Sequence, residues 1–306
     1  MSYSNRQRGI AIVIVIWVMT LIVIIAGSYS LAMRTESAST SSVVRAAKAR
    51  ALTEGGVWLG IHALLKPLAN QSIRGDGAVQ TVQIAGQIVH VAVQDLGGLI
   101  DLNSASRELL AGLMRAAGVE RSLQETLVDR IIDWRDRDSE VSPRGAEDDT
   151  YRAAGFAYGA KDAPFNTVDE LQRVMGVTAS VYRAVESMVT VGSGYPGIRA
   201  DTAPREVLLA VPGLSVEFVD RLLEGRGTAQ FKVLMSLLPH TARPYLSLAP
   251  GRNYRVRAEA TIEGTTARVT ALVELGRSRK RPFILWSWQE GGVPLVASLV
   301  AGDSSG

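Results

Sequence analysis

The feature that most constrains the fold is a long apolar run near the start of the sequence. From Ile10 to Met33 there are 24 consecutive uncharged residues, nearly all of them Ile, Val, Leu, Met, Ala or Trp. At about 1.5 Å of rise per residue, a helix of this length spans the hydrocarbon core of a bilayer, about 30 Å. The run also exceeds the apolar core of a secretory signal peptide, about 7 to 15 residues. It therefore predicts a membrane anchor that stays in the mature protein.

The helical pattern continues beyond the apolar run. Apolar residues recur there at three- and four-residue steps, and no proline occurs until Pro67. The recurring residues are Val44, Ala47, Ala51, Trp58, Ile61, Leu65 and Leu68. The pattern predicts one helix from Ile10 to about Lys66, whose first part lies in the membrane and whose later part is amphipathic. The only expected interruption is local flexibility at Gly55-Gly56.

The residues before the run suggest how the anchor is processed. Arg6, Arg8 and Gly9 precede Ile10 without a spacer. A small residue in front of the apolar segment, rather than behind it, resembles a type IV pilin-like leader. In such leaders a membrane peptidase on the cytoplasmic side cuts after the residue that corresponds to Gly9, and the new N-terminus, here Ile10, is N-methylated. An ordinary anchor with an accidental glycine remains the alternative, as does cleavage by a signal peptidase at residues 30–32.

Composition permits an envelope protein and argues against an enzyme. The chain has 306 residues, a net charge of +3 and no cysteine, so disulfides and thiol chemistry are excluded. Its three histidines, His62, His90 and His240, lie far apart in sequence, so no base, nucleophile and orienting group are visible together. We expect no catalytic activity and no catalytic residues.

Strand patterns flank a long helical region. Two alternating runs, Val79–Ile84 and Ile88–Val93, predict a β-hairpin, and runs from Asn253, Thr266 and Phe283 predict further strands. Residues from about 100 to 245 have the pattern of helices and turns. The predicted class is α+β: a long N-terminal transmembrane helix, an antiparallel β-sheet, and a large all-α domain inserted between strands.

The predicted helical region contains an internal sequence repeat. The segments "NSASRELL" at Asn103 and "DTAPREVL" at Asp201 match, and "NTVDEL" at Asn166 is a looser copy. Each copy supplies residues that cap helix N-termini and leads toward a glycine turn. The turn glycines are Gly118, Gly176 and Gly213.

Helix, hairpin, helix is also a DNA-binding design, which gives an alternative of another class. In that design a second glycine lets the backbone approach a phosphate. Here Glu120, Thr178 and Ser215 replace it. Residues 101–243 also carry 17 Lys and Arg against 21 Asp and Glu, whereas a phosphate-binding module needs a basic surface. We interpret these hairpins as structural and expect no nucleic acid partner.

An acidic segment is the strongest candidate for ligand chemistry. Seven carboxylates fall within the 19 residues Asp133–Tyr151: Asp133, Asp136, Asp138, Glu140, Glu147, Asp148 and Asp149. Ca²⁺ takes six to eight oxygen ligands, and an acidic loop with two-residue steps can wrap such an ion. The spacing departs from an EF-hand, because Val141 stands where the turn glycine belongs. Spacing alone leaves a solvated, salt-bridged loop as an equal alternative.

These segments occur in a distinctive order. "LIDLNSASRELL", "DWRDRDSEVSPRGAEDDTY", "APFNTVDELQRVMGVT" and "ADTAPREVLLAVPGL" follow the leader-like start. Together they resemble the minor pseudopilin K family of type II secretion systems, also called general secretion pathway protein K. Ile14 fits this resemblance, because most pilin-like subunits have glutamate five residues after the cut and the K subunit lacks it.

The resemblance implies a function and a set of partners. It implies a type IV pilin-like fold at the tip of a periplasmic pseudopilus that supports export of folded proteins across the outer membrane. The implied partners are the minor pseudopilins I, J and H, the major pseudopilin, the prepilin peptidase and the inner-membrane assembly platform. It further implies a single-pass inner-membrane protein with its bulk in the periplasm. A minor pilin of a type IV pilus, or a membrane-anchored DNA-uptake protein, is the alternative.

The resemblance also implies structural Ca²⁺ and a domain plan. The expected metal ligands are Asp136, Asp138, Glu147, Asp148 and Asp149. The expected plan is leader 1–9, transmembrane half-helix 10–33, periplasmic half-helix 34–66, first part of the sheet 67–99, inserted helical domain 100–245, remaining strands 246–290 and C-terminal tail 291–306.

Overall fold

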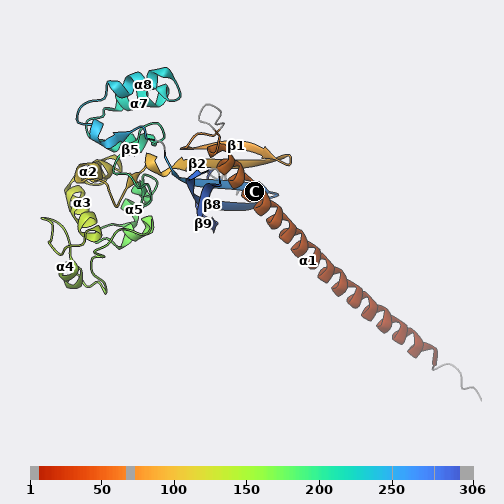
Figure 1. The fold of residues 1–306 in the computed structure, drawn as a ribbon. Coiled ribbons are helices and arrows are strands. Elements are labelled where there is room, and N and C mark those ends of the chain that lie inside the picture. The colour runs from red at the N-terminus through yellow and green to blue at the C-terminus, as the bar shows by residue number, and fades with distance from the viewer. Residues whose placement is uncertain (1–6, 67–72, 250, 279, 297–306) are drawn as a thin grey trace, which may run out of the picture.

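A computed structural model describes residues 7–66, 73–249, 251–278 and 280–296 (Figure 1). Its first element is the helix α1 (Gln7–Leu64), 58 residues long, whose N-terminal part projects as a free rod away from the rest of the molecule. The sequence predicted a start at Ile10 and an end near Lys66, so the observed ends differ by two or three residues. Residues 1–6 of the predicted leader lie outside the described residues.

The projecting part of α1 is the predicted membrane segment. Within the described residues, Ile12–Tyr29 is the helical stretch that is long and apolar enough to cross a bilayer. Its side chains are exposed throughout, because no other element packs against it. The segment is therefore presented to lipid or to another chain rather than to this protein's own core.

A five-stranded antiparallel sheet packs against the C-terminal part of α1. The strand order is β1-β2-β7-β8-β9, so the third strand arrives after a long excursion of the chain. The strands are β1 (Asp76–Ile84), β2 (Gln87–Asp95), β7 (Asn253–Ile262), β8 (Thr265–Ser278) and β9 (Arg281–Glu290). The predicted antiparallel sheet is confirmed, including the strand that was expected from Phe283.

Two glycines allow α1 to approach the sheet closely. A Cβ at Gly60 would lie 2.7 Å from Cγ1 of Val256, and one at Gly56 would lie 2.8 Å from Cγ1 of Val89. The helix runs without a break through Gly55-Gly56. The expected interruption there does not occur, and Gly56 and Gly60 provide close packing within a continuous helix.

The excursion between β2 and β7 forms the insertion, which lies beside one end of the sheet (Figure 1). Its larger elements are α2 (Arg107–Ala116), α3 (Arg121–Arg135), α4 (Asp148–Ala153), α5 (Ala179–Val185), α6 (Arg205–Ala210), α7 (Val216–Gly225) and α8 (Ala229–Ser236). Its 3-10 turns are η2 (Leu96–Gly98), η3 (Val168–Arg173) and η4 (Arg243–Tyr245).

The expectation that the insertion is all-α needs one correction. It also contains two parallel pairs of two-residue strands: β3 (Ile100–Asp101) with β4 (Val189–Thr190), and β5 (Ile198–Arg199) with β6 (Leu246–Ser247). Such short pairs leave no alternating pattern in a sequence, because a period of two needs several residues to be visible.

The glycine turns form as predicted, and the residues that follow two of them cap helices. Gly118, Gly176 and Gly213 all have positive φ, of 70°, 91° and 83°. The hydroxyl of Thr178 accepts from the N–H of Val181, and that of Ser215 accepts from the N–H of Phe218. These hydroxyls occupy N–H groups that a DNA-binding hairpin would offer to phosphate.

Two of the repeated segments begin helices in different ways. Ser106 caps α2 and accepts from the N–H of Leu109. Asn103 instead exchanges hydrogen bonds with the backbone of Phe165, at 2.7 and 3.0 Å. Pro204 stands at the N-cap position of α6.

Candidate assembly surface and acidic loop

The exposed apolar side of α1 is the first candidate functional surface, here called the α1 surface. Within the membrane segment its exposed residues include Ile14 and Trp17. Beyond that segment Val43, Val44 and Leu59 remain exposed although the same helix packs against the sheet. Apolar side chains left uncovered over the length of a helix indicate contact with another helix or with lipid.

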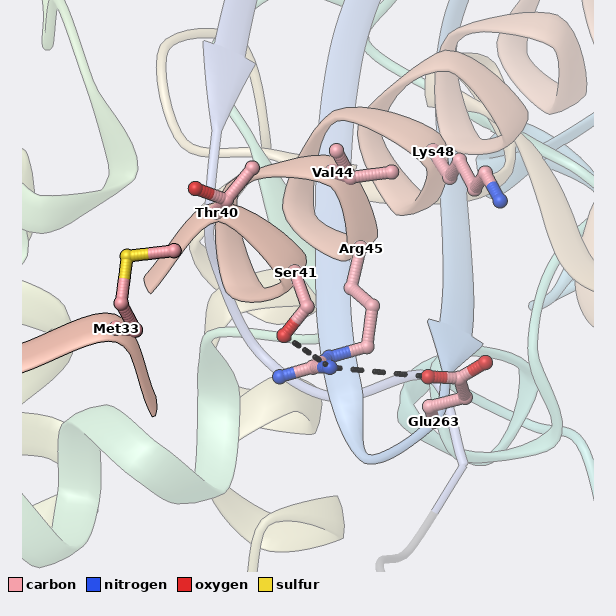
Figure 2. Close-up of a pocket in the computed structure, with 7 residues that line it drawn as sticks. All are labelled: Met33, Thr40, Ser41, Val44, Arg45, Lys48 and Glu263. Atoms are coloured by element: carbon pink, nitrogen blue, oxygen red, sulfur yellow. Dashed lines mark hydrogen bonds and ion pairs between the residues drawn. The ribbon is translucent and has the colours of Figure 1, made fainter. Parts of the chain in front are cut away.

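A groove of about 580 Å³ lies where α1 passes the β7–β8 turn. Figure 2 shows the side chain of Arg45 reaching from α1 toward Glu263 in that turn, with Lys48 one turn farther along the helix. Arg45 donates to the hydroxyl of Ser41 at 3.1 Å and forms an ion pair with Glu263 at 3.8 Å. The groove continues the α1 surface toward the membrane segment, where Met33 lines it.

The acidic loop is organised around the buried carboxylate of Asp133, near the end of α3. Its Oδ2 atom accepts from the backbone N–H of Ser142 at 3.2 Å and from that of Ala146 at 2.9 Å. Gly145 lies directly against this carboxylate, and a Cβ there would overlap it. A buried carboxylate thus holds both ends of the loop that joins α3 to α4.

Several carboxylate oxygens in this loop are buried without a hydrogen-bond donor among the described residues. They are both oxygens of Glu147 and one oxygen each of Asp133 and Asp136. Glu147 is 5% exposed, and Asp133 is fully buried. Buried carboxylate oxygens are normally paired with donors or with a metal ion, so these oxygens have the chemistry of ligands for a hard cation.

The electrostatics of the loop agree with that interpretation. Burial, together with the charges of Asp138, Asp133 and Asp162, raises the pKa of Asp136 to about 6 against the opposing effect of Arg135. Burial also raises the pKa of Glu147 to about 7, with contributions from the neighbouring carboxylates, of which Asp162 is the largest. These groups lie close enough to repel one another, and a cation among them would relieve the repulsion.

The structure brings together only part of the predicted ligand set. Asp136, Asp138 and Glu147 share one neighbourhood. Asp148 and Asp149 instead form ion pairs with Arg152 at 2.6 and 2.9 Å, and the Asp149 side chain is 99% exposed. The buried oxygens without a donor do not belong to Asp148 or Asp149, so these two residues fit a ligand role poorly.

Two neighbours of the site were absent from the predicted set. Asp133 was among the seven acids but was not selected, and only its burial marks it. Asp162 follows Glu147 by 15 residues and has a positive φ of 51°, neither of which is a spacing signal. Within the described residues, no three acidic or histidine side chains converge to a complete metal site as they stand.

Comparison with known proteins finds similarity to one family. A family model described as type II secretion system (T2SS), protein K matches residues 91–194, which include the acidic loop. The type II secretion system protein K of Pseudomonas aeruginosa is 21% identical and covers 95% of this chain and 96% of its own length. The protein K of Dickeya chrysanthemi is 29% identical over 142 residues, 43% of this chain and 38% of its own length.

The chain is thus similar to the type II secretion system protein K family, over residues 91–194 by the family model and over nearly its whole length by the Pseudomonas aeruginosa protein. A solved structure has the same fold. It is described as the GspK-GspI-GspJ complex from the type 2 secretion system of enterotoxigenic Escherichia coli. The matched chain is 18% identical with a TM-score of 0.64, over 83% of this chain and all of that one. The DNA-uptake and type IV pilus alternatives are not favoured.

Proposed function

We propose that this chain is a minor pseudopilin at the tip of the periplasmic pseudopilus. There it assembles with the minor pseudopilins I and J and supports the export of folded proteins across the outer membrane. The observation that carries the proposal is the continuity of α1, which leads from an exposed membrane segment into the packed sheet without a break. A rod of this kind can dock along neighbouring rods while its globular part remains at one end.

The position of the insertion supports a place at the leading end of the fibre. The insertion interrupts the sheet between β2 and β7 and lies at the end of the molecule away from the free part of α1 (Figure 1). A subunit added above this one would meet the insertion before it could reach the α1 surface. We infer that the insertion caps the fibre. Pseudopilin H, the major pseudopilin and the assembly platform then contact the chain on its membrane side.

The anchor is expected to remain in the mature protein after processing. We propose that the prepilin peptidase cuts after Gly9 on the cytoplasmic side and that Ile10 becomes a methylated N-terminus. The protein would then be a single-pass inner-membrane protein with its bulk in the periplasm. We expect no enzymatic activity, and the prepilin peptidase acts on this chain as its substrate.

We further propose that the acidic loop holds structural Ca²⁺. Asp136 and Glu147 supply carboxylate oxygens, with Asp133, Asp138 and Asp162 close by. The support is the set of buried, donor-free oxygens described above, together with the raised pKa values of Asp136 and Glu147. Bound Ca²⁺ would cancel the repulsion among these acids and fix the loop between α3 and α4.

The decisive test combines mass spectrometry with a secretion assay. The membrane-extracted protein should have the mass of a chain that begins at methylated Ile10. Deleting the gene should abolish export of folded proteins, and the full chain should restore it. A mature chain that begins after about residue 33 and leaves the membrane would overturn the proposal.

A further inference from the structure

The inference concerns the face of the sheet opposite α1, here called the back face. Val256 and Ala258 on β7 lie under the close approach of α1 at Gly60 and Gly56. Successive side chains of a strand point to opposite faces. Arg255, just before Val256, and Arg257, between Val256 and Ala258, therefore lie on the back face.

These two arginines have no counter-charge within the described part of the chain. Both are half-buried, and neither guanidinium group forms a hydrogen bond or an ion pair with any residue that the structure describes. Their cross-strand neighbours are uncharged: Gln94 and Leu272 beside Arg255, and Ala92 and Thr270 beside Arg257.

The nearest carboxylates on this face are already engaged. Glu259 accepts from Arg268 at 2.9 Å and from the backbone N–H of Leu295 at 2.7 Å. Glu274 accepts from Arg252 at 2.7 Å and from the indole N–H of Trp286 at 3.1 Å. The two arginines therefore form a concentrated positive patch in the middle of the sheet.

The environment makes this patch energetically unfavourable in the isolated chain. Burial lowers the pKa of both guanidinium groups, and the charge of Arg257 lowers that of Arg255 further. Partly buried charges in proteins are normally paired, because removing a charge from water without a partner is costly. An external carboxylate would convert this cost into a favourable charge-assisted contact.

The patch is bounded along the strand. At one end Tyr182 of α5 approaches Arg255. At the other end residues 291–295 cross the sheet, where Leu295 reaches Glu259 and Gly292 lies near Thr270. Between these limits Arg255 and Arg257 stand two residues apart on one strand, so their backbone positions are about 7 Å apart. Two carboxylates at alternate positions of an extended segment have the same spacing.

We propose that Arg255 and Arg257 form a docking site for two carboxylates, two residues apart, on an extended acidic segment of another pseudopilin of the tip complex. The inference rests on the proposed function, because it requires a protein partner. A protein segment fits better than one small anion, because an extended chain repeats the spacing of the two strand positions and can offer one carboxylate to each arginine.

The test uses the full chain, co-expressed with the minor pseudopilins I and J of the same secretion system and purified in detergent. The variants are Arg255→Met with Arg257→Met, and Arg257→Lys. Arg121→Met is the matched control, because Arg121 is an exposed arginine of α3 without a carboxylate partner in the described part of the chain. Readouts are the affinity of the complex at two salt concentrations and the Tm of each variant alone.

We expect the double variant to bind I and J about tenfold or more weakly, with a reduced salt dependence. Its Tm alone should be unchanged or raised, because an unpaired charge has been removed. The lysine variant should bind at an intermediate level and the control like wild type. A lowered Tm of the free chain, or unchanged binding, overturns the inference. A wild-type chain that binds neither I nor J overturns the proposed function as well.

Discussion

Oδ2 of Asp133 accepts a hydrogen bond from the backbone N–H of Ala146 at 2.9 Å, across a loop of 12 intervening residues. This contact places Glu147, the next residue, beside the end of α3. The carboxylate that closes the loop is itself fully buried, and its other oxygen has no donor among the described residues. The loop is therefore folded around negative charge, which is an unusual arrangement without a cation.

Calcium should stabilise the full chain in detergent. At free Ca²⁺ one hundred times its Kd, linkage adds about 2.7 kcal/mol to the free energy of unfolding. The expected measurement is a thermal transition that rises by several degrees with Ca²⁺ and falls with chelator. An identical transition in both conditions would rule out a structural ion.

Substitution should separate ligands from bystanders in the same segment. Asp136→Asn and Glu147→Gln should each abolish most of the Ca²⁺-dependent rise in Tm, because both carry donor-free buried oxygens. Asp149→Asn is the matched control, since its side chain is exposed and paired with Arg152. Equal losses in all three variants would indicate a diffuse charge effect rather than a site.

In chelator, stability should fall as pH rises from about 4 to about 7. The pKa values of Asp136 and Glu147 are raised in the folded chain, to about 6 and about 7. The folded state therefore binds more protons than the unfolded state across this range, and deprotonation favours unfolding. Denaturant melts of the full chain at pH 5 and pH 7.5 test this, and Glu147→Gln should reduce the slope. A rising or flat profile that Glu147→Gln leaves unchanged would contradict the prediction.

Close packing of α1 on the sheet should depend on Gly60. Gly60→Val places a side chain where Cγ1 of Val256 already lies within 2.7 Å of a built Cβ, so overpacking should cost about 1 to 3 kcal/mol. Gly55→Ala is the control, because its Cβ meets Ile84 at an ordinary 3.5 Å and improves helix propensity. Thermal melts should show a lower Tm for the first and an unchanged or higher Tm for the second.

Periodicity made much of the fold predictable. The apolar run from Ile10, the alternating strands near Val79 and Asn253, and the turn glycines such as Gly213 each carry a local signal that survives in the structure. The role of Gly56 and Gly60 was not predictable, because a glycine that adjoins another element looks in sequence like one that weakens its helix.

In the acidic loop, the sequence alone did not identify which carboxylates are buried together. Carboxylate spacing led to Asp148 and Asp149, which form helical ion pairs with Arg152 instead. Asp162 joins the site through the tertiary fold, and only the structure reveals the buried oxygens of Glu147. Charge density in the sequence therefore indicated the acidic loop, but burial was needed to select the candidate ligands within it.

The absence of a carboxylate at Ile14 should be important for assembly of the tip complex. In pilin-like subunits a glutamate at this position pairs with the N-terminal ammonium of a neighbour, and a subunit that offers no such carboxylate suits the leading end of the fibre. Ile14 is exposed within the membrane segment, so Ile14→Glu places a charge in lipid at a cost of about 2.5 to 3.5 kcal/mol. We expect reduced recovery of the tip complex and reduced secretion, whereas Ile14→Val should behave like wild type. Comparable membrane levels of both variants, checked by immunoblot, would separate an assembly defect from failed insertion. Normal secretion and assembly by Ile14→Glu would show that the position tolerates a carboxylate and would remove this argument for the tip location.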